Sequence, residues 1–353
     1  MSSLKEVIKE ITAIDRNLMK NTQTRLDNLT KPQGSLGRLE EIAKLIVGIT
    51  GKENPSLKNK VIFTLAGDHG VTEEKISLYP KEVTVQMVYN FLNGGAGINV
   101  LAKHIGARVI VADLGVASDL KAGPKLIIKK INYGTKNMAK GPAMTKEEAI
   151  QSIEAGIEIF EAEYKNGIDI IGIGEMGIGN TTPSSALTAV LTKRAVKDVT
   201  GRGTGLDDQG LENKIRVIEQ AISCNHPNVS DAIDCLAKIG GFEIGGICGV
   251  ILAAAAKKVP VVIDGFISAT GALVAYHLEP KVKEYFIASH CSAEKGHWII
   301  LEHLGLSPLL DLNLRLGEGT GAALGISIAE AAVKILTQMA TFKSAGVSEK
   351  SKS

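Results

Sequence analysis

The amino-acid sequence predicts an α/β protein in which a mostly parallel sheet is flanked by helices, together with a small helical domain. Six short runs rich in apolar and β-branched residues begin at residue 61, and each ends in a polar or glycine-rich turn. Unbroken apolar runs of this length are typical of strands buried on both faces, and helical patterns separate most of them. Before residue 61, apolar residues recur at helical spacing instead.

The N-terminal region, to about residue 55, reads as three helices. Ser3 and Glu6 have the spacing of a capping box at the start of the first helix. Pro32 and Gly34 interrupt the pattern before the third. A long apolar helix near the C-terminus is expected to return and pack on these helices. The predicted division is a small helical domain of residues 1–58 plus 326–345, a large α/β domain of residues 59–325, and a polar, frayed tail of residues 346–353.

The polar turns that follow the strands are the expected location of the functional site. In open α/β sheets, ligands bind outside the carboxyl ends of the strands, so side chains from several turns meet there. The predicted strands lie within residues 61–70, 108–115, 125–134, 168–177, 259–266 and 284–292. Their turns carry Asp68, His69, Asp113, Asn132, Glu175, Asp264, Ser289 and His290.

Composition excludes several classes of partner. The 353 residues carry 40 Lys and Arg against 38 Asp and Glu, without the like-charge block that marks a nucleic-acid-binding arm. The N-terminus lacks a signal-peptide pattern, and the longest apolar run, residues 245–256, is too short to span a bilayer. Four cysteines without a C-x-x-C pair are typical of reduced thiols. We therefore expect a cytoplasmic protein that binds neither nucleic acid nor membrane.

One glycine motif matches the G-x-G-x-x-G spacing of a dinucleotide-binding loop, at Gly172, Gly174 and Gly177. That fingerprint also needs an acidic residue about 20 positions later, at the end of a second strand. Asp198 lies at this distance, but the residues between read as helix, and the charge of Glu175 would face the pyrophosphate. The dinucleotide interpretation fails on this context. A cradle for one phosphate and a plain tight turn both stay open.

Four further motifs have two readings each. Residues 201–214 are either an anion-binding loop supported by Lys214 or a solvated loop with a helix cap at Asp207 or Asp208. The His, Cys and Glu side chains of residues 289–298 either form a metal site or are polar residues of the turn at a strand end and helix start, and their spacing is not that of a standard zinc site. The Asp and His of residues 66–71 either belong to a metal site or shape the pocket. Glu318, between two glycines, is either a general base with a raised pKa or an exposed loop residue.

Ten ordered motifs, from about Leu29 to Leu336, together resemble the nicotinate-nucleotide:dimethylbenzimidazole phosphoribosyltransferase family of cobalamin lower-ligand synthesis. The resemblance implies transfer of the phosphoribosyl group of nicotinate mononucleotide to 5,6-dimethylbenzimidazole, with inversion at the anomeric carbon. The motifs are LTKPQGSLGRLE, AGDHGV, YPKEVTVQMV, GGAGINVLA, GIGEMGIGNTTPSSAL, GRGTGLDD, GGFEIGGICG, DGFISATGAL, SHCSAEKGH and LRLGEGTGAAL.

The resemblance also implies roles for individual residues. Glu318 is the catalytic base that takes the azole proton, and Glu175 is a second carboxylate near the sugar. It implies a Rossmann-like sheet, a homodimer and chemistry without a cofactor or metal ion. The phosphate is assigned to Gly177, Gly179, Asn180, Thr181, Thr182, Gly203 and Lys214, and the benzimidazole to Tyr79, Gln86 and Met176.

Two other functions compete with this interpretation. The literal glycine spacing favours an NAD-dependent oxidoreductase, which would bind NAD and would not respond to nicotinate mononucleotide. A non-catalytic binder of azoles or nucleotides would bind its ligand without releasing nicotinate. The three hypotheses therefore differ in ligand and in product.

Overall fold

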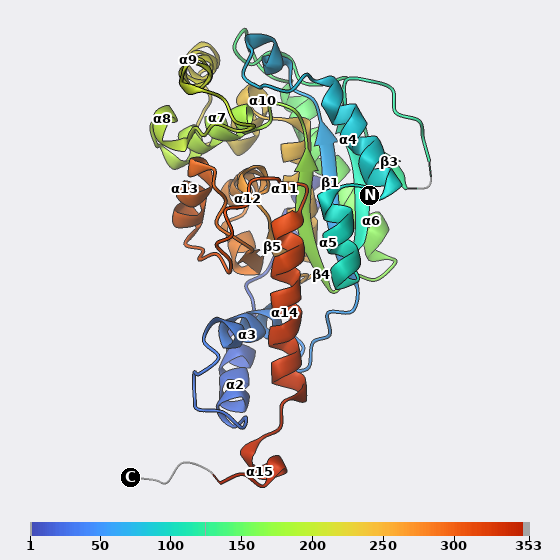
Figure 1. Cartoon of the computed structure of the whole chain (residues 1–353), viewed down its shortest axis with the longest axis vertical. Helices are drawn as coiled ribbons and strands as arrows, with labels where there is room; N and C mark the ends of the chain where they lie inside the picture. The colour runs from blue at the N-terminus through green and yellow to red at the C-terminus, as the bar shows by residue number, and fades with distance from the viewer. Residues whose placement is uncertain (1, 124, 349–353) are drawn as a thin grey trace.

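The computed structural model, which describes residues 2–123 and 125–348, contains a six-stranded parallel sheet flanked by helices (Figure 1). The predicted fold class is confirmed, and each predicted run contains a strand. The strands lie side by side in the order β3-β2-β1-β4-β5-β6. They are β1 (Lys60–Gly67), β2 (Arg108–Gly115), β3 (Leu126–Ile128), β4 (Ile170–Met176), β5 (Val261–Ile263) and β6 (Phe286–Ala288).

The central strand β1 is mostly apolar because both of its faces are covered. All eight of its residues are buried. Successive side chains of a strand point to opposite faces. Phe63 and Leu65 accordingly belong to one hydrophobic core and Ile62 and Ala66 to the other.

Helices cover the two faces of the sheet and meet these two cores. One core includes residues of α1 (Leu4–Glu10), α6 (Lys146–Tyr164), α7 (Thr181–Thr192), α10 (Ala232–Ile239), α11 (Phe242–Ala256) and α12 (Phe266–Leu278). The other includes residues of α2 (Arg16–Asp27), α3 (Arg38–Thr50), α4 (Glu82–Asn93), α5 (Gly97–Ile105) and α14 (Thr320–Gln338). The remaining elements are η1 (Gly70–Glu74), α8 (Val196–Val199), α9 (Asp208–Asn225), η2 (Pro280–Tyr285), α13 (Lys295–Leu304) and α15 (Phe342–Ala345).

The N-terminal helices divide between two parts of the molecule. Figure 1 shows α14 running from the sheet down to α3 and α2, and α14 contacts α3 as the sequence predicts. The first helix, α1, instead packs on α11 and α6. Residue 326, the predicted domain boundary, lies inside α14. The division into a small and a large domain therefore stays a prediction. The contacts of α1 place this helix with the predicted large domain and not with the small one.

Two helices contain the most apolar sequence of the chain. The run at residues 245–256 lies in α11, where every residue from Phe242 to Ala255 is buried. By length and composition alone, α14 is long enough to cross a membrane, but 56% of its apolar window is buried inside the protein. Its buried residues include Ala322 and Ile326, which lie against Gly172 of β4.

The strand order creates a switch point between β1 and β4. The connections from β1 proceed to β2 and β3 in one direction, whereas β4, β5 and β6 extend in the other. Loops that leave β1 and β4 therefore turn to opposite sides, and a crevice opens at the carboxyl ends of these strands. Glu175 lies at this end of β4, paired in register with Leu65 of β1.

Close approach of two helix backbones explains several glycines in α11. A Cβ atom on Gly249 would lie 1.8 Å from the carbonyl oxygen of Ile153 in α6. A Cβ atom on Gly156 of α6 would lie 2.0 Å from the carbonyl oxygen of Gly246. Only glycine lets the two helices pack at this distance.

The Gly249→Ala variant should be less stable than the wild type by about 1–3 kcal/mol, because the added methyl group overpacks the crossing of α6 and α11. This cost outweighs the ~1 kcal/mol that alanine gains over glycine in a helix. Denaturant unfolding measures the difference. Gly141→Ala is the control, since a Cβ atom there has no neighbour within 4 Å. Equal stability of the two variants would contradict the close crossing.

Candidate functional site

A cavity of about 660 Å³ lies at the carboxyl ends of the strands. Its walls come from the segments that follow β4, β5 and β6, from the η1–α4 region, from the loop at Gly203 and from residues 313–318. The cavity thus lies where the sequence analysis expects the functional site. The cavity brings together nine of the predicted site residues: Tyr79, Glu175, Met176, Gly177, Gly179, Asn180, Thr181, Gly203 and Glu318.

Glu318 occupies a strained loop that is held against the sheet. Its φ of +63° lies in the left-handed region, as do those of Gly317 and Gly319 on either side. The Thr64 hydroxyl donates to the Glu318 carbonyl oxygen at 3.0 Å. A Cβ atom on Gly174 would lie 2.1 Å from that oxygen, so β4 has glycine where the loop crosses it. Such strain persists only where surrounding contacts hold the residue in place.

The Glu318 carboxylate lies at the start of α5. The backbone N–H of Ile98 donates to its Oε2 atom at 3.0 Å. The side chain is buried, and burial raises its pKa above the usual value, against the lowering effect of the N–H groups of Ile98 and Gly97. A buried carboxylate that has a raised pKa and lines a cavity is suited to act as a general base.

Glu175 is a second buried carboxylate beside the same loop. The Asn180 side-chain amide donates to its Oε2 atom. Burial raises the pKa of Glu175 to about 8, and the negative charges of Asp264 and others add to this effect. A Cβ atom on Gly317 would lie 2.3 Å from Oε1 of Glu175, so the Glu318 loop passes directly over it.

Asp264 ties the end of β5 to the start of α14. It accepts the backbone N–H of Ala322 at 2.9 Å and that of Gly319 at 3.2 Å. The side chain is almost fully buried, and burial raises its pKa to about 7 despite these N–H donors. Since α14 begins two residues after Glu318, this contact helps to fix the Glu318 loop.

Toward its other end the cavity is lined by Gly179, Thr181 and Gly203 of the predicted phosphate group, whereas Lys214 of that group lies behind them and does not line the cavity. Thr181 begins α7, and the Lys214 ammonium donates to its hydroxyl at 2.6 Å. A Cβ atom on Gly203 would lie 3.1 Å from the Thr181 Oγ1 atom and 3.3 Å from the Lys214 Nζ atom, so the three residues meet. Lys214 is fully buried behind Thr181, and burial lowers its pKa to about 8.

Thr182 and Gln86 are not among the residues that line the cavity. Thr182 is completely buried in the first turn of α7, where its hydroxyl has no hydrogen-bond partner among the described residues. Gln86 is exposed on α4, whereas Val83 and Met87 of that helix line the cavity. Tyr79 is 54% exposed, which puts it at the rim of the apolar wall.

The strand-end residues Asp68 and His69 form a buried polar group with Glu243, a residue that the sequence analysis did not single out. The His69 Nε2 atom lies 2.8 Å from Glu243 Oε1, and all three side chains are buried. The Ala117 N–H donates to Asp68 at 2.8 Å. Glu243 lies in the first turn of α11, and a single charged residue in an otherwise apolar helix was the available signal.

Two other strand-end residues lie outside the cavity. Asp113 is buried and paired with Lys130 at 3.0 Å, and it accepts the N–H of Val116. Asn132 is exposed and donates to Glu148. These contacts support the loop after β2 and the start of α6, so both residues have structural roles.

Arg315 is a cavity residue that sequence reasoning missed. It lines the cavity and donates to the carbonyl oxygen of Gly203 at 3.3 Å. It precedes Glu318 by three residues, so one segment borders both ends of the cavity. The basic residue in the L-R-L-G-E-G motif was the available signal.

The histidines of residues 289–298 are held by hydrogen bonds within the protein. The Ser292 N–H donates to Nδ1 of His297 at 3.0 Å, and Ser289 Oγ lies 3.0 Å from Nδ1 of His290. Over residues 2–123 and 125–348, no group of three or more His, Cys, Asp or Glu side chains is arranged to hold a metal ion. The polar-turn reading of this motif therefore has direct contacts in its support.

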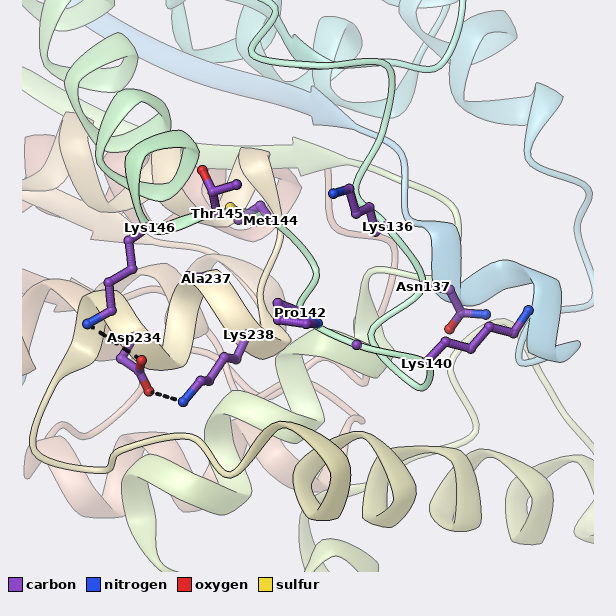
Figure 2. Close-up of a pocket in the computed structure, with 11 residues that line it drawn as sticks. Lys136, Asn137, Lys140, Pro142, Met144, Thr145, Lys146, Asp234, Ala237 and Lys238 are labelled. Carbon is purple, nitrogen blue, oxygen red and sulfur yellow. Dashed lines mark ion pairs between the residues drawn. The ribbon is translucent and has the colours of Figure 1, made fainter.

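A second cavity, of about 600 Å³, lies beside α10 (Figure 2). Figure 2 shows Lys146 and Lys238 meeting Asp234, at 3.5 and 2.9 Å. Lys140, on the other side of this cavity, pairs with Glu73 at 2.8 Å. Carboxylates therefore already compensate the charges of these lysines. This cavity contains none of the predicted site residues.

Fold and site together define a class: an α/β enzyme that acts on a small phosphorylated ligand, with buried carboxylates at one end of its cavity and a lysine-supported glycine turn at the other. A family model described as Phosphoribosyltransferase matches residues 11–347. The chain belongs to this phosphoribosyltransferase family.

Individual relatives agree with the resemblance expected from the motifs. The chain is 56% identical to nicotinate-nucleotide--dimethylbenzimidazole phosphoribosyltransferases of Geobacter sulfurreducens and Desulforudis audaxviator, over 99% of this chain and 99% of each relative. The crystal structure of CobT from Thermus thermophilus is similar, with a TM-score of 0.92 and 43% identity over 95% of this chain and 100% of that one. The predicted family is confirmed.

The raised pKa of Glu175 predicts a pH dependence of stability. Its folded pKa of about 8 lies above the unfolded value of 4.5, so its stabilising contribution is present below pH 4.5 and lost as the pH rises through 8. Between pH 5 and pH 8, the free energy of unfolding of the wild type should therefore fall more than that of Glu175→Gln, by roughly 2 to 4 kcal/mol.

Denaturant unfolding at the two pH values measures this difference. Glu212→Gln, at an exposed position of α9, is the matched control and should behave as the wild type does. Parallel pH dependence of the wild type and Glu175→Gln would show that Glu175 ionises normally in the folded protein.

Proposed function

We propose that this enzyme transfers the phosphoribosyl group of nicotinate mononucleotide to 5,6-dimethylbenzimidazole, giving α-ribazole 5′-phosphate and nicotinate. The observation that carries the proposal is the position of Glu318, a buried carboxylate in a strained loop at the edge of a cavity. The names of the relatives describe the same two substrates.

Glu318 is the general base of the proposed reaction. One ring nitrogen of the benzimidazole attacks the anomeric carbon with its lone pair, and the proton on the other nitrogen passes to the Glu318 carboxylate. The bond from the anomeric carbon to the pyridinium nitrogen breaks, and its electron pair returns to the nicotinate ring. Because the pyridinium is cationic, nicotinate leaves without being protonated.

Glu175 stabilises the positive charge that develops on the anomeric carbon of the ribose during the reaction. Near neutral pH, burial and the neighbouring Asp264 favour its protonated form in the free site. A cationic pyridinium nucleotide beside it favours the carboxylate instead, so nucleotide binding promotes loss of the proton. The resulting negative charge stabilises an oxocarbenium-like centre. Attack from the face opposite the leaving group converts the β-nucleotide into an α-riboside.

The phosphate of the nucleotide binds at the start of α7. The turn from Gly177 to Thr181 presents backbone N–H groups and the Thr181 hydroxyl at a helix N-terminus, which favours an anion. Lys214 supplies a positive charge through its contact with Thr181, and Gly203 closes the other side. The apolar wall near Met176, Val83 and Met87 suits the flat benzimidazole ring, with Tyr79 at its rim.

The remaining expectations come from the resemblance. We propose a homodimer, which light scattering of the purified protein tests directly. We also propose a cytoplasmic enzyme that needs no cofactor or metal ion, in keeping with its four free cysteines. An NAD-dependent oxidoreductase is not favoured, because Gly172 and Gly174 lie inside β4 and pack against Ile62 and Glu318.

The Glu318→Gln variant should lose turnover by a hundredfold or more and still bind nicotinate mononucleotide, because only the proton acceptor is removed. Chromatography of wild-type reactions should show nicotinate and α-ribazole 5′-phosphate in equal amounts, without added metal. In the wild type, turnover should fall as the pH drops through the raised pKa of Glu318, where the base becomes protonated. Release of nicotinate at the wild-type rate by Glu318→Gln would refute its role.

Lys214→Met should weaken the use of nicotinate mononucleotide by about ten- to a hundredfold in kcat/KM, because the positive charge that Lys214 holds behind Thr181 and the phosphate is lost. Nicotinate riboside, which lacks the phosphate, should be used equally by the variant and the wild type. Lys197→Met is the control, at an exposed position of α8. An equal loss with both substrates would mean that Lys214 acts on folding and does not bind phosphate.

A further inference from the structure

The segment that follows β6 connects the two ends of the cavity. His290, Ser292 and Glu294, at alternate positions, all line it. At one end, a Cβ atom on Gly321 in the first turn of α14 would lie 2.0 Å from His290 Nδ1. At the other end, a Cβ atom on Gly201 would lie 2.0 Å from Glu294 Oε2. The segment therefore runs from the Glu318 loop to the phosphate loop, along the part of the cavity where a ribose must lie.

Hydrogen bonding determines which nitrogen of His290 carries a proton. The Ser289 hydroxyl donates its single proton to the Ile263 carbonyl oxygen at 2.6 Å. Toward His290 Nδ1, at 3.0 Å, the same hydroxyl is then an acceptor. Nδ1 must therefore carry the ring proton. The Asp264 carboxylate, 3.9 Å from Nδ1, favours this arrangement further.

The other ring nitrogen of His290 is consequently an acceptor. No described residue forms a hydrogen bond with Nε2, and a methyl group at the cavity residue Gly265 would lie 3.8 Å from Nε2 and Cε1. The ring is 2% exposed, and burial lowers its pKa to about 4, so it is neutral at pH 7. A neutral ring held in one tautomer presents one lone pair to the cavity.

We propose that His290 Nε2 accepts a hydrogen bond from a ribose hydroxyl of the nucleotide substrate, and that Ser289 is the positioning residue that fixes its tautomer. This inference rests on the proposed function. Ribose hydroxyls are the donors that a nucleotide offers between its phosphate and its anomeric carbon. The contact would hold the sugar in place while its anomeric carbon moves from one ring nitrogen to the other.

Nicotinate mononucleotide and its 2′-deoxy and 3′-deoxy analogues test the proposal. In the wild type, one of the two analogues should lose about ten- to a hundredfold in kcat/KM, because Nε2 is left without a donor. His290→Ala should lose a similar factor with the intact nucleotide and should no longer distinguish that analogue from it. Equal use of all three nucleotides by the wild type, or full discrimination by His290→Ala, would overturn the inference.

Ser289→Ala keeps the imidazole ring and removes the acceptor for Nδ1. Ser289→Ala should reduce the discrimination between the intact and deoxy nucleotides. If His290→Ala does not fold, the kinetics of Ser289→Ala test the proposal instead. Melting temperature and calorimetric binding of dimethylbenzimidazole are the folding controls. Nitrogen NMR of histidine-labelled protein should show a proton on Nδ1 of His290, and a proton on Nε2 would refute the assignment.

Nicotinate release and nucleotide discrimination by the wild type together distinguish failure of the ribose contact from failure of the proposed reaction. If the wild type releases no nicotinate from the intact nucleotide, the proposed reaction fails, and calorimetric affinities for the three nucleotides then test the ribose contact. If nicotinate is released but the wild type does not discriminate, only the ribose contact is wrong.

Discussion

Burial of negative charge at the carboxyl ends of the strands is the constraint on which the site depends. Three carboxylates, Glu175, Asp264 and Glu318, are buried there. A buried charge is costly unless it is hydrogen-bonded, and helices begin where parallel strands end. The starts of α14 and α5 accordingly donate N–H groups to Asp264 and Glu318. The fold thus supplies the partners that let carboxylates persist in an apolar interior, with pKa values high enough for proton transfer.

The cavity is electrically asymmetric, and its asymmetry matches that of the substrate. Glu175 and Glu318 at one end suit a pyridinium cation. At the other end the Lys214 ammonium behind Thr181 suits a phosphate, although the Glu294 carboxylate also lines the cavity there. A nucleotide bound in reverse would put its phosphate beside the carboxylates and its pyridinium beside the lysine. Like charges in a buried site disfavour that orientation strongly. In the proposed binding mode, charge therefore favours one orientation of the nucleotide, while shape and hydrogen bonds such as the one proposed for His290 refine the position of the sugar.

The sequence predicted most of the sheet and the place of the cavity at the strand ends, because both follow from local patterns. Buried parallel strands need apolar runs, and residues just after them must meet at one edge, as Glu175, Asp264 and His290 do. Contacts between distant segments were not predictable. The packing of α1 on α11 and the exposure of Gln86 on α4 depend on which faces of a helix find partners. Nor does a local pattern show that Lys130 pairs with Asp113 and removes it from the site.

The glycine motif shows how one spacing serves two purposes. In a dinucleotide fold, the first glycines form the turn that approaches the pyrophosphate. Here Gly172 and Gly174 lie within β4, where they make room for Ile62, Ala322 and the Glu318 loop. Only the glycines after the strand, such as Gly179 with its φ of +85°, shape the turn. The first two glycines thus let the proposed base approach the sheet, and the later ones form the turn that we propose binds the phosphate. Both ends of the cavity are therefore encoded in a single strand and the turn that follows it.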